Sequence, residues 1–515
     1  MTAPTALDSV RRATELAELA DGLRVDVIVV GGGITGAGIA LDAASRGLGV
    51  ALVEKHDLAF GTSRWSSKLV HGGLRYLATG NIGIARRSAI ERGILMTRNA
   101  PHLVNAMPQL VPLLPSMGRA SRALVRTGFI AGDGLRRLAG TSASILPRSR
   151  RVDAHRAVEL APTVRTEGLD GGFLAYDGQL IDDARLVTAV ARTAAQHGAR
   201  ILTRVSARAV DATSVHLTDE LTGESFDASA RVVINATGVW AGDLDPALTL
   251  RPSRGTHLVF DAAAFGNPTA ALTIPIPGEL NRFVFAMPEQ LGRVYLGLTD
   301  EEAPGPIPDV PQPTPAEIDF LLDTVNTALA AELTTADVRG SYAGLRPLID
   351  TGAGSTADVS REHAVVESAS GVLSIIGGKL TEYRYMAEDV VDRALTLRGL
   401  SAAACRTANL PLVGAPANPV STLRSAHALP SSLVARYGAE APNVIAQARC
   451  MRPTEPVADG IDVIRAEFEY AVTHEGALTV DDILDRRTRI GLVAADRARA
   501  ADAAAEMIAE FGKVG

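Results

Sequence analysis

Residues 26–48 read DVIVVGGGITGAGIALDAASRGL, and this stretch decides the fold of the chain. A short run rich in β-branched residues, 26–30, stops at a cluster of glycines, and a pattern of small helix-forming residues follows through Arg46. A second apolar run, 49–55, reads as another buried strand. Strand, tight turn, helix and strand within about 30 residues form a βαβ unit, which predicts a parallel sheet.

The glycines of the turn match the dinucleotide-binding pattern GxGxxG. Gly31, Gly33 and Gly36 follow the strand directly, and Ile34 and Thr35 open the helix. The first glycine permits the tight turn, the second lets the backbone approach a pyrophosphate, and the third allows close packing. Because a helix N-terminus also attracts phosphate, the turn predicts a nucleotide cofactor.

The acid at the end of the second strand narrows the choice of nucleotide. Glu54 lies about 20 residues beyond the glycines, where a carboxylate binds ribose hydroxyls and repels a 2′-phosphate. This favours FAD or NAD over NADP. Further turns at 236–238 and 377–380 indicate a long, extended FAD, and a helix beginning near Gly378 and Lys379 would stabilise negative charge on the reduced ring.

The rest of the chain predicts two further structural parts. Residues 231–238 and 371–378 read as returning strands of the parallel sheet, whereas 256–260, 282–288 and 292–300 alternate as antiparallel strands do. A capping box at Thr314 and Glu317 begins a helix, and the C-terminus is helical in pattern. We therefore expect an α/β fold with a Rossmann-type FAD-binding domain, an antiparallel-sheet substrate domain and a C-terminal α-helical domain.

The length of 515 residues exceeds the roughly 250 to 300 at which single cores stop growing, so several domains are expected. The composition shifts predict an N-terminal extension at 1–24 and an oxidoreductase domain at 25–408, whose substrate cap lies mainly at 250–340. A linker rich in Pro, Ala and Ser at 409–432 then leads to a helical domain at 433–515.

Composition excludes several classes of protein. The two cysteines, Cys405 and Cys450, cannot form a disulfide framework and lack the spacing of a zinc site, which favours a reducing, cytoplasmic setting. A formal net charge of −7 argues against nucleic-acid binding. Charged residues precede any apolar run at the N-terminus, so we expect no secretory signal. The most apolar stretch, 25–44, is interrupted by Asp26, Asp42 and several glycines, so we expect no membrane-spanning helix.

Five motifs in order carry a resemblance to a known family. They are VIVVGGGITGAGIALDAASRGL at 27–48, SSKLVHGGLRYL at 66–77, YDGQLIDDARLV at 176–187, YAGLRPL at 342–348 and IGGKLTEYR at 376–384. Together they resemble the FAD-dependent glycerol-3-phosphate dehydrogenases. The resemblance implies a glycine-oxidase-like flavin fold, a substrate domain over the flavin, noncovalent FAD, and delivery of electrons to membrane quinone.

The resemblance also implies cofactor contacts along the chain. Beyond the glycine turn and Glu54, these are Thr62, Ser63, Ser66, Ser67, Lys68, His71, Gly72, Gly73, Ala236, Gly238, Gly378, Lys379, Leu380 and Thr381. The chain departs from the family pattern at Arg64 and Trp65, where small residues are expected, and at Glu382, where threonine is usual. Neither departure removes a group that the chemistry needs.

A phosphorylated substrate requires convergent cations. A phosphate monoester carries about −1.5 to −2 charge, and arginine forks match its oxygens. The resemblance assigns substrate contacts to Arg75, Arg346 and Arg361, with Tyr76 nearby, and counts Arg346 and Lys379 among the catalytic residues. The substrate implied is sn-glycerol 3-phosphate.

Oxidation of a secondary alcohol also requires a base, which accepts the hydroxyl proton while hydride passes to flavin N5. His257 in RGTHLVF is the expected base and a substrate contact, because it matches a family position near the substrate. A neutral imidazole accepts a proton near pH 7. His71 is a second candidate.

The segment 116–151 has eight arginines against one acid, interleaved with large apolar residues. Such a basic amphipathic segment binds an anionic lipid surface, which a quinone-reducing enzyme needs to reach. We therefore expect peripheral contact with the inner face of the cytoplasmic membrane. A solvated helical face or a rim that steers phosphate explains the same composition.

Other functions remain open on the sequence. An amino-acid or amine oxidase shares the fold, a glycerol-3-phosphate oxidase would use oxygen in place of quinone, and an FAD-containing scaffold would not turn over. The acidic balance disfavours a flavoprotein that acts on RNA. The oligomeric state, a homodimer included, is not decided by these patterns.

Overall fold

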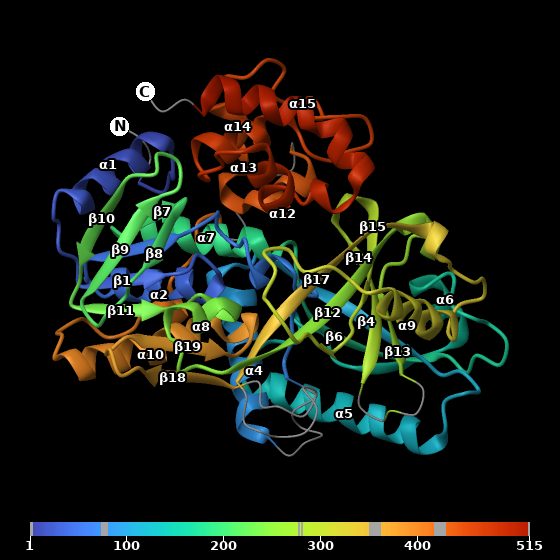
Figure 1. Ribbon diagram of the computed structural model, residues 1–515. Helices are drawn as coiled ribbons and strands as arrows, with labels where there is room; N and C mark the ends of the chain where they lie inside the picture. Colours follow the sequence, from blue (N-terminus) through green and yellow to red (C-terminus); the bar gives the residue numbers. More distant parts are fainter. Residues whose placement is uncertain are drawn as a thin grey trace.

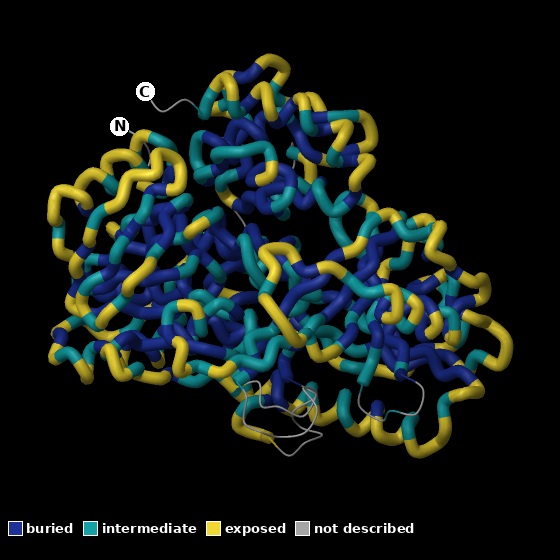
Figure 2. The backbone as a smooth tube through the Cα atoms, viewed as in Figure 1, coloured by how far each residue is buried: buried dark blue, intermediate teal, exposed yellow. Residues whose placement is uncertain are grey.

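The computed structural model describes residues 4–73, 81–276, 279, 282–349, 362–416 and 429–512. The chain forms a sheet domain next to a second, larger sheet, and a helical domain that bridges the two (Figure 1). Buried segments form the interior of each of these three parts (Figure 2). Among the described residues, none of the helices combines the length and apolar character needed to span a bilayer.

The first part is built on the predicted βαβ unit. Its six-stranded sheet has the order β18 (His363–Glu367), β19 (Leu373–Gly377), β11 (Val232–Asn235), β1 (Val27–Val30), β2 (Val50–Glu54) and β7 (Arg200–Thr203). All pairings are parallel except that of β18 with β19. The sequence-based prediction that 231–238 and 371–378 return to this sheet is therefore confirmed.

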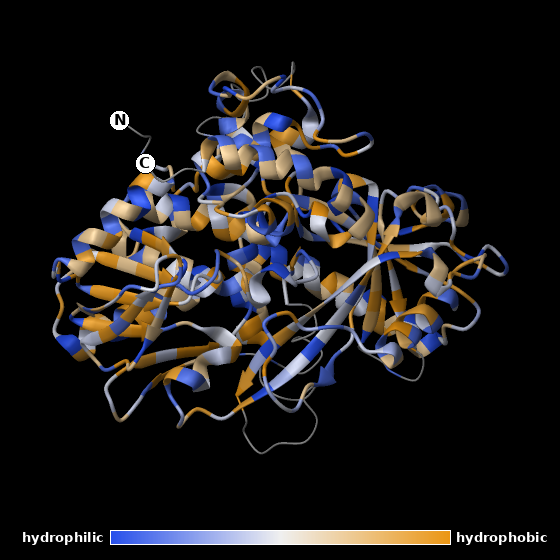
Figure 3. Cartoon of the chain, turned by 45° about the horizontal axis from the view of Figure 1, so that its top comes forward, coloured by the Kyte–Doolittle hydropathy of each residue, from blue (hydrophilic) through white to orange (hydrophobic). Residues whose placement is uncertain are grey.

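Both faces of this sheet are covered, which explains its continuous apolar strands. One face packs against α2 (Ile34–Ser45), α7 (Asp183–Gln196) and α10 (Tyr383–Arg398). The other packs against α1 (Ser9–Ala20) and a three-stranded sheet of β8 (Val205–Arg208), β9 (Ser214–Asp219) and β10 (Ser225–Ser229). Figure 3 shows the apolar colouring of the strands between these layers.

The second part is a ten-stranded, mostly antiparallel sheet. It contains the predicted strands β12 (Leu250–Asp261), β14 (Phe283–Glu289) and β15 (Arg293–Gly297), joined by β13 (Ala271–Pro275), β16 (Glu301–Glu302) and β17 (Val338–Ile349). It also takes in β3 (Leu69–Val70), β4 (Val104–Pro112), β5 (Arg150–Val152) and β6 (Gly172–Leu180), which the sequence-based boundaries of 250–340 did not include. Two prolines in β4 obscure its strand pattern, so that no strand was predicted there.

Helices close the outer surface of this sheet. The predicted helix is α9 (Pro315–Asn326), and its capping box of Thr314 and Glu317 is confirmed. Its Leu321, Leu322 and Val325 are buried and Ile318 is half-buried, as the helical spacing predicted. The other helices of these two parts are α4 (Ile82–Ile94), α5 (Arg119–Leu138), α6 (Ala154–Leu160) and α8 (Ala241–Leu244).

The third part is helical, as predicted. It comprises α12 (Ser431–Tyr437), α13 (Ala441–Ala446), α14 (Arg465–Thr473), the π-helix η11 (Asp482–Arg487) and α15 (Ala494–Phe511). Its own apolar core includes Phe468, Ile483 and Met507. The chain enters it after residues 401–416, which are tied to the first part because Asn99 Nδ2 donates to the Thr407 and Leu410 carbonyls at 2.9 and 2.7 Å.

Candidate active site

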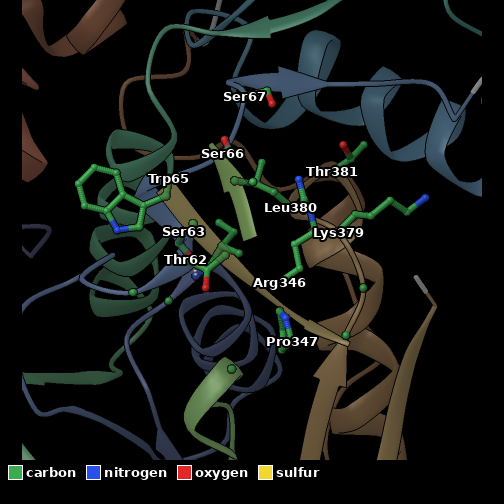
Figure 4. Close-up of a pocket in the computed structure, with 18 of the residues that line it drawn as sticks. Thr62, Ser63, Trp65, Ser66, Ser67, Arg346, Pro347, Lys379, Leu380 and Thr381 are labelled. Carbon is green, nitrogen blue, oxygen red and sulfur yellow. Dashed lines mark hydrogen bonds between the residues drawn. The ribbon is translucent and has the colours of Figure 1, made fainter. Parts of the chain in front are cut away.

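A cavity of about 880 Å³ lies between the six-stranded sheet and the ten-stranded sheet. Its volume lies within the roughly 300 to 1,000 Å³ typical of ligand and cofactor sites. Most of the predicted site residues line it: Gly31, Gly33, Ile34, Thr35, Glu54, Thr62, Ser63, Ser66, Ser67, His71, Ala236, Gly238, His257, Arg346, Gly378, Lys379, Leu380 and Thr381. Figure 4 shows the loop at 62–67 and the turn at 379–381 on opposite sides, with Arg346 between them.

One end of the cavity is formed by backbone. Gly31 has φ +114°, and a Cβ atom added there would lie 2.6 Å from the Ala236 carbonyl oxygen. A Cβ atom on Gly36 would lie 1.9 Å from the Gly31 carbonyl oxygen. Gly36 does not line the cavity, so its role is the close packing of helix on turn. Gly33 caps α2, whose N-terminus faces the cavity and attracts anions.

Glu54 closes this end beside the glycines. Its Oε2 accepts a hydrogen bond from the Gly32 amide at 2.6 Å, and its Oε1 accepts one from the His56 amide at 2.8 Å. Burial raises the pKa of this carboxyl, while the two amides oppose that shift. Each oxygen keeps a lone pair, so the position remains suitable for ribose hydroxyls.

Two further turns line the middle of the cavity. Gly238 at φ +63° follows β11, Gly377 at φ +76° ends β19, and Gly378 at φ +78° follows it. Lys379 then caps the 3₁₀ helix η8 (Leu380–Glu382), which continues into α10. The sequence predicted a helix beginning here, and its N-terminus faces the same cavity.

The serine-rich loop joins the two ends. Ser63 Oγ accepts a hydrogen bond from the Ile34 amide at 2.9 Å, and Thr62 Oγ1 donates to the Leu345 carbonyl at 2.6 Å. Ser67 Oγ lies 2.8 Å from His257 Nε2. The loop therefore contacts the dinucleotide turn, β17 and the candidate base within six residues.

His257 lies on β12 at the far end of the cavity and is 1% exposed. Its ring stacks on Tyr342 of β17, with centroids 4.7 Å apart and planes at 11°. Burial, together with the nearby Lys68 and Arg346 cations, holds the pKa of His257 well below 6.5. The imidazole is therefore neutral near pH 7 and able to accept a proton.

Arg346 lies on β17 and extends into the cavity from the β12 side. Its Nη1 donates to Ser253 Oγ and to Asp300 Oδ1, both at 3.1 Å. Only 21% of its side chain is exposed. The guanidinium lies close to the Gly255 backbone of β12: a Cβ atom added to Gly255 would approach Nη2 to 2.3 Å. These hydrogen bonds hold the guanidinium of Arg346 in place at the cavity wall.

Lys379 contributes to the wall mainly through its backbone. Its Nζ donates to Ser88 Oγ of α4 at 2.7 Å and pairs with Glu382 at 2.8 Å. Figure 4 shows the side chain pointing away from Arg346. Glu382, which departs from the family pattern, therefore binds the ammonium that the sequence assigned to catalysis.

Other predicted contacts lie elsewhere. Lys68 does not line the cavity: its backbone has φ +56°, and its ammonium is buried against Asp183 at 2.8 Å. Gly72 and Gly73 also lie off the wall and allow close contact with α4. Arg75, Tyr76 and Arg361 lie outside the described residues.

The sequence missed several wall residues. Val125 and Phe129 of α5 line the cavity, although the segment was assigned to membrane contact as a whole. Their four-residue spacing indicates an inner face, and that signal was present in the sequence. Tyr342, the ring beneath His257, opens the YAGLRPL motif but had no predicted role. Thr299 and Asp300, which hold Arg346, end a predicted strand.

The residues present fit FAD. The glycine turn leaves backbone space for a pyrophosphate, Glu54 lies where a ribose is expected, and the cavity continues past two more glycine turns to His257. The glycine turn binds the adenosine diphosphate half of NAD and of FAD in the same way. The further turns at 236–238 and 377–380 extend the cavity and suit the longer FAD.

Comparison with known proteins decides the family. A model of FAD-dependent oxidoreductases matches residues 26–384, and a model of the C-terminal domain of alpha-glycerophosphate oxidase matches 405–513. The chain belongs to the FAD-dependent oxidoreductases. Glycerol-3-phosphate dehydrogenase 1 of Mycobacterium tuberculosis is 76% identical over 98% of both chains, and glycerol-3-phosphate dehydrogenase 2 of that organism is 37% identical over 91% of this chain and 81% of its own. The resemblance drawn from the motifs is confirmed.

Solved structures support the same fold. Glycerol-3-phosphate dehydrogenase from Bacillus halodurans, complexed with FAD, superposes with a TM-score of 0.76 at 28% identity and covers 98% of this chain and 94% of its own. Glycine oxidase from Geobacillus kaustophilus superposes with a TM-score of 0.52 at 19% identity over 72% of this chain and 95% of its own, which shows the fold alone. The expected glycine-oxidase-like FAD fold is confirmed.

Proposed function

We propose that this chain oxidises sn-glycerol 3-phosphate to dihydroxyacetone phosphate, with FAD as the hydride acceptor and a membrane quinone as the final electron acceptor. The observation that carries the proposal is the meeting of a neutral, buried His257 with Arg346 at one end of a cavity whose other end is a dinucleotide turn. The high identity to glycerol-3-phosphate dehydrogenase 1 supports this substrate.

The chemistry divides between cofactor and protein. Bound FAD supplies an acceptor at N5 for the hydride, which is two electrons and a proton from the substrate carbon. Loss of that hydride and of the hydroxyl proton converts the secondary alcohol into a ketone. His257 accepts the hydroxyl proton through Ser67: as the substrate hydroxyl gives its proton to Ser67 Oγ, the Ser67 proton passes to His257 Nε2, 2.8 Å away. Stacking on Tyr342 keeps the ring plane fixed during the transfer.

The protein positions both reactants through fixed groups. Gly31, Gly33 and Glu54 would hold the adenosine diphosphate half, and the loop at 62–67 and the turn at 378–381 would hold the ring. Arg346 binds the anionic substrate through the side of its guanidinium that faces the cavity. Arg75, Tyr76 and Arg361 remain predicted substrate contacts.

The quinone proposal rests on the outer face of α5. Exposed arginines and exposed large apolar residues share this helix and the segment after it: Arg119, Arg126, Ile130, Arg137, Leu138, Ile145, Arg148 and Arg150. The inner face of the same helix lines the cavity. A cytoplasmic protein resting on anionic lipid through α5 would place its cavity close to a lipid-dissolved quinone.

Anaerobic reduction tests the substrate. Purified protein with FAD, mixed anaerobically with glycerol 3-phosphate, should lose its flavin absorbance, whereas plain glycerol or an amino acid should leave it oxidised. Bleaching by an amino acid alone would instead establish the oxidase alternative. Absence of bleaching with every substrate would contradict turnover and leave the scaffold alternative.

Reoxidation tests the acceptor. A water-soluble quinone added to the reduced protein should restore the flavin absorbance much faster than air-saturated buffer does. Rapid recovery with oxygen and none with quinone would establish a glycerol-3-phosphate oxidase.

Binding to lipid is tested with vesicles. Vesicles of anionic lipid should bind the protein at low salt and release it at high salt, while neutral vesicles should not bind. Arg126→Gln should weaken that binding by about 1 kcal/mol, or roughly fivefold. Arg452→Gln, an exposed arginine of the C-terminal domain, is the control and should leave it unchanged.

A further inference from the structure

The two residues at which the serine-rich loop departs from its family have a partner in the C-terminal domain. Arg64 is 2% exposed, and its guanidinium lies 4.2 Å from the Trp65 ring centroid. Arg489, which follows η11, lies 5.3 Å from the same centroid. The loop at 64–68 is thus the place where the C-terminal domain docks beneath the candidate active site.

Four buried charged side chains hold this loop from below. Arg489 Nη2 donates to the Arg64 carbonyl at 2.7 Å, and Arg489 Nε pairs with Asp182 Oδ2 at 3.1 Å. Lys68 Nζ donates to the same carbonyl at 3.0 Å and to Asp183 Oδ2 at 2.8 Å. We call Arg489, Asp182, Asp183 and Lys68 the buried clamp; each side chain is at most 3% exposed.

The buried clamp binds Ser66, and the next residue, Ser67, contacts the candidate base. Asp183 Oδ2 accepts hydrogen bonds from the Ser66 amide at 2.9 Å and from Ser66 Oγ at 2.7 Å. The Tyr342 hydroxyl donates to the Ser66 carbonyl at 3.1 Å. The next residue is Ser67, whose hydroxyl contacts His257 Nε2. Ser66 is therefore fixed on both sides of its peptide, and Ser67 with it.

We propose that Arg489 of the C-terminal domain is a positioning residue for the reaction: through the buried clamp it fixes Ser67, and Ser67 fixes the ring of His257. The C-terminal domain is then part of the active site although none of its residues that the structure describes lines the cavity. The inference rests on the proposed function, in which His257 is the base.

Charge and geometry both favour this role over simple stabilisation. Buried ion pairs are an uncertain source of stability, because desolvation offsets much of their attraction, but they hold neighbouring groups in one arrangement. A base must lie within hydrogen-bond reach of the proton it takes, so a displacement of about 1 Å lowers the rate by as much as about 100-fold.

The first experiment compares two buried arginines of the C-terminal domain. Arg489→Met should lower kcat about 10- to 100-fold while KM for glycerol 3-phosphate changes little, because Arg346 remains in place. Arg436→Met is the matched control: Arg436 is equally buried and pairs with Glu467 inside the C-terminal domain, away from the loop. It should lower the melting temperature with kcat unchanged. Equal kcat values in the two variants would overturn the proposal.

A double-mutant cycle separates positioning from damage to the fold. Ser67→Ala removes the contact to His257 without disturbing the buried clamp, and it should lower kcat at full flavin loading. If Arg489 acts through Ser67, then the double variant should be no slower than the slower single variant. Losses that multiply, or a Ser67→Ala protein with normal kcat, would contradict the proposal.

If the Arg489→Met variant does not fold, kcat of an Arg489→Lys variant tests the same proposal. Lysine retains the charge beside Asp182 but cannot also bind the Arg64 carbonyl, so kcat should fall between the parent and the methionine variant. A lysine variant with the kcat of the parent would overturn the proposal. Failure of the proposed function would look different, because the parent protein itself would then not oxidise glycerol 3-phosphate.

Discussion

The two ends of the cavity are built in different ways. The dinucleotide end is made of backbone from one short stretch, in which Gly31 and Gly36 remove side chains that would collide with neighbouring carbonyls. The reactive end is made of side chains from distant stretches: Ser67 contacts His257, 190 residues away in the sequence, and Arg346 is held by Asp300, 46 residues away. Local geometry thus determines cofactor binding, whereas tertiary packing determines the chemistry.

This difference predicts that mutations at the two ends fail in different ways. A substitution at the dinucleotide end should prevent FAD binding. A substitution at the reactive end should leave FAD bound but lower kcat.

Gly36→Val should abolish most flavin binding. Its Cβ atom would lie 1.9 Å from the Gly31 carbonyl oxygen, so the turn and helix would have to separate. The ratio of flavin absorbance to protein absorbance after purification measures this. Gly83→Ala on α4, where an added Cβ meets nothing within 4 Å, should retain full flavin.

His257→Asn should lower kcat by about 100- to 10,000-fold while flavin content stays near that of the parent. The asparagine cannot accept the hydroxyl proton, but it leaves the glycine turn untouched. Steady-state rates at saturating glycerol 3-phosphate measure the loss. His155→Asn, at an exposed position, is the control. A fall of less than threefold in the His257 variant would assign the base to another residue, with His71 the next candidate.

Arg346→Met should cost about 1.5 to 3 kcal/mol of charged hydrogen bonding, or roughly 10- to 100-fold in kcat/KM for glycerol 3-phosphate. The loss should be much smaller with plain glycerol, which lacks the phosphate. An equal loss with both substrates would show that Arg346 supports the fold of the site and does not bind the anion.

The pH dependence should show the smallest change. Because burial and the Lys68 and Arg346 cations hold the pKa of His257 well below 6.5, the base stays neutral as the pH falls from 7 through 6.5. The acid limb of kcat/KM should therefore begin only at lower pH. A tenfold fall in kcat/KM per pH unit beginning near 6.5 would mean that His257 titrates normally in the folded protein.

The sequence predicted the locally built features well. The βαβ unit, the capped helix at Pro315 and the helix after Gly378 follow from short-range patterns, and the structure has all three. Lys68 was assigned to the cofactor because its motif implied it, but Asp183, which binds its ammonium, lies 115 residues away. No spacing rule reveals such a partner.

The same limit applies to Lys379, Glu382 and Arg489. Their partners lie on α4, on α7 and in the loop at 64–68, and only the folded chain brings them together. Helix α5 is an intermediate case. Its cavity-lining residues Val125 and Phe129 are four positions apart, and this helical spacing can be recognised in the sequence.

The most direct test of the central claim is a crystal structure of the protein with FAD and glycerol 3-phosphate bound. The adenosine half should lie at the glycine turn, and the flavin ring between the loop at 62–67 and the turn at 378–381. The substrate hydroxyl should lie within hydrogen-bond distance of Ser67 Oγ, which connects it to His257 Nε2, and the substrate phosphate should lie at Arg346. A substrate bound elsewhere, or a flavin ring lying far from His257, would contradict that claim.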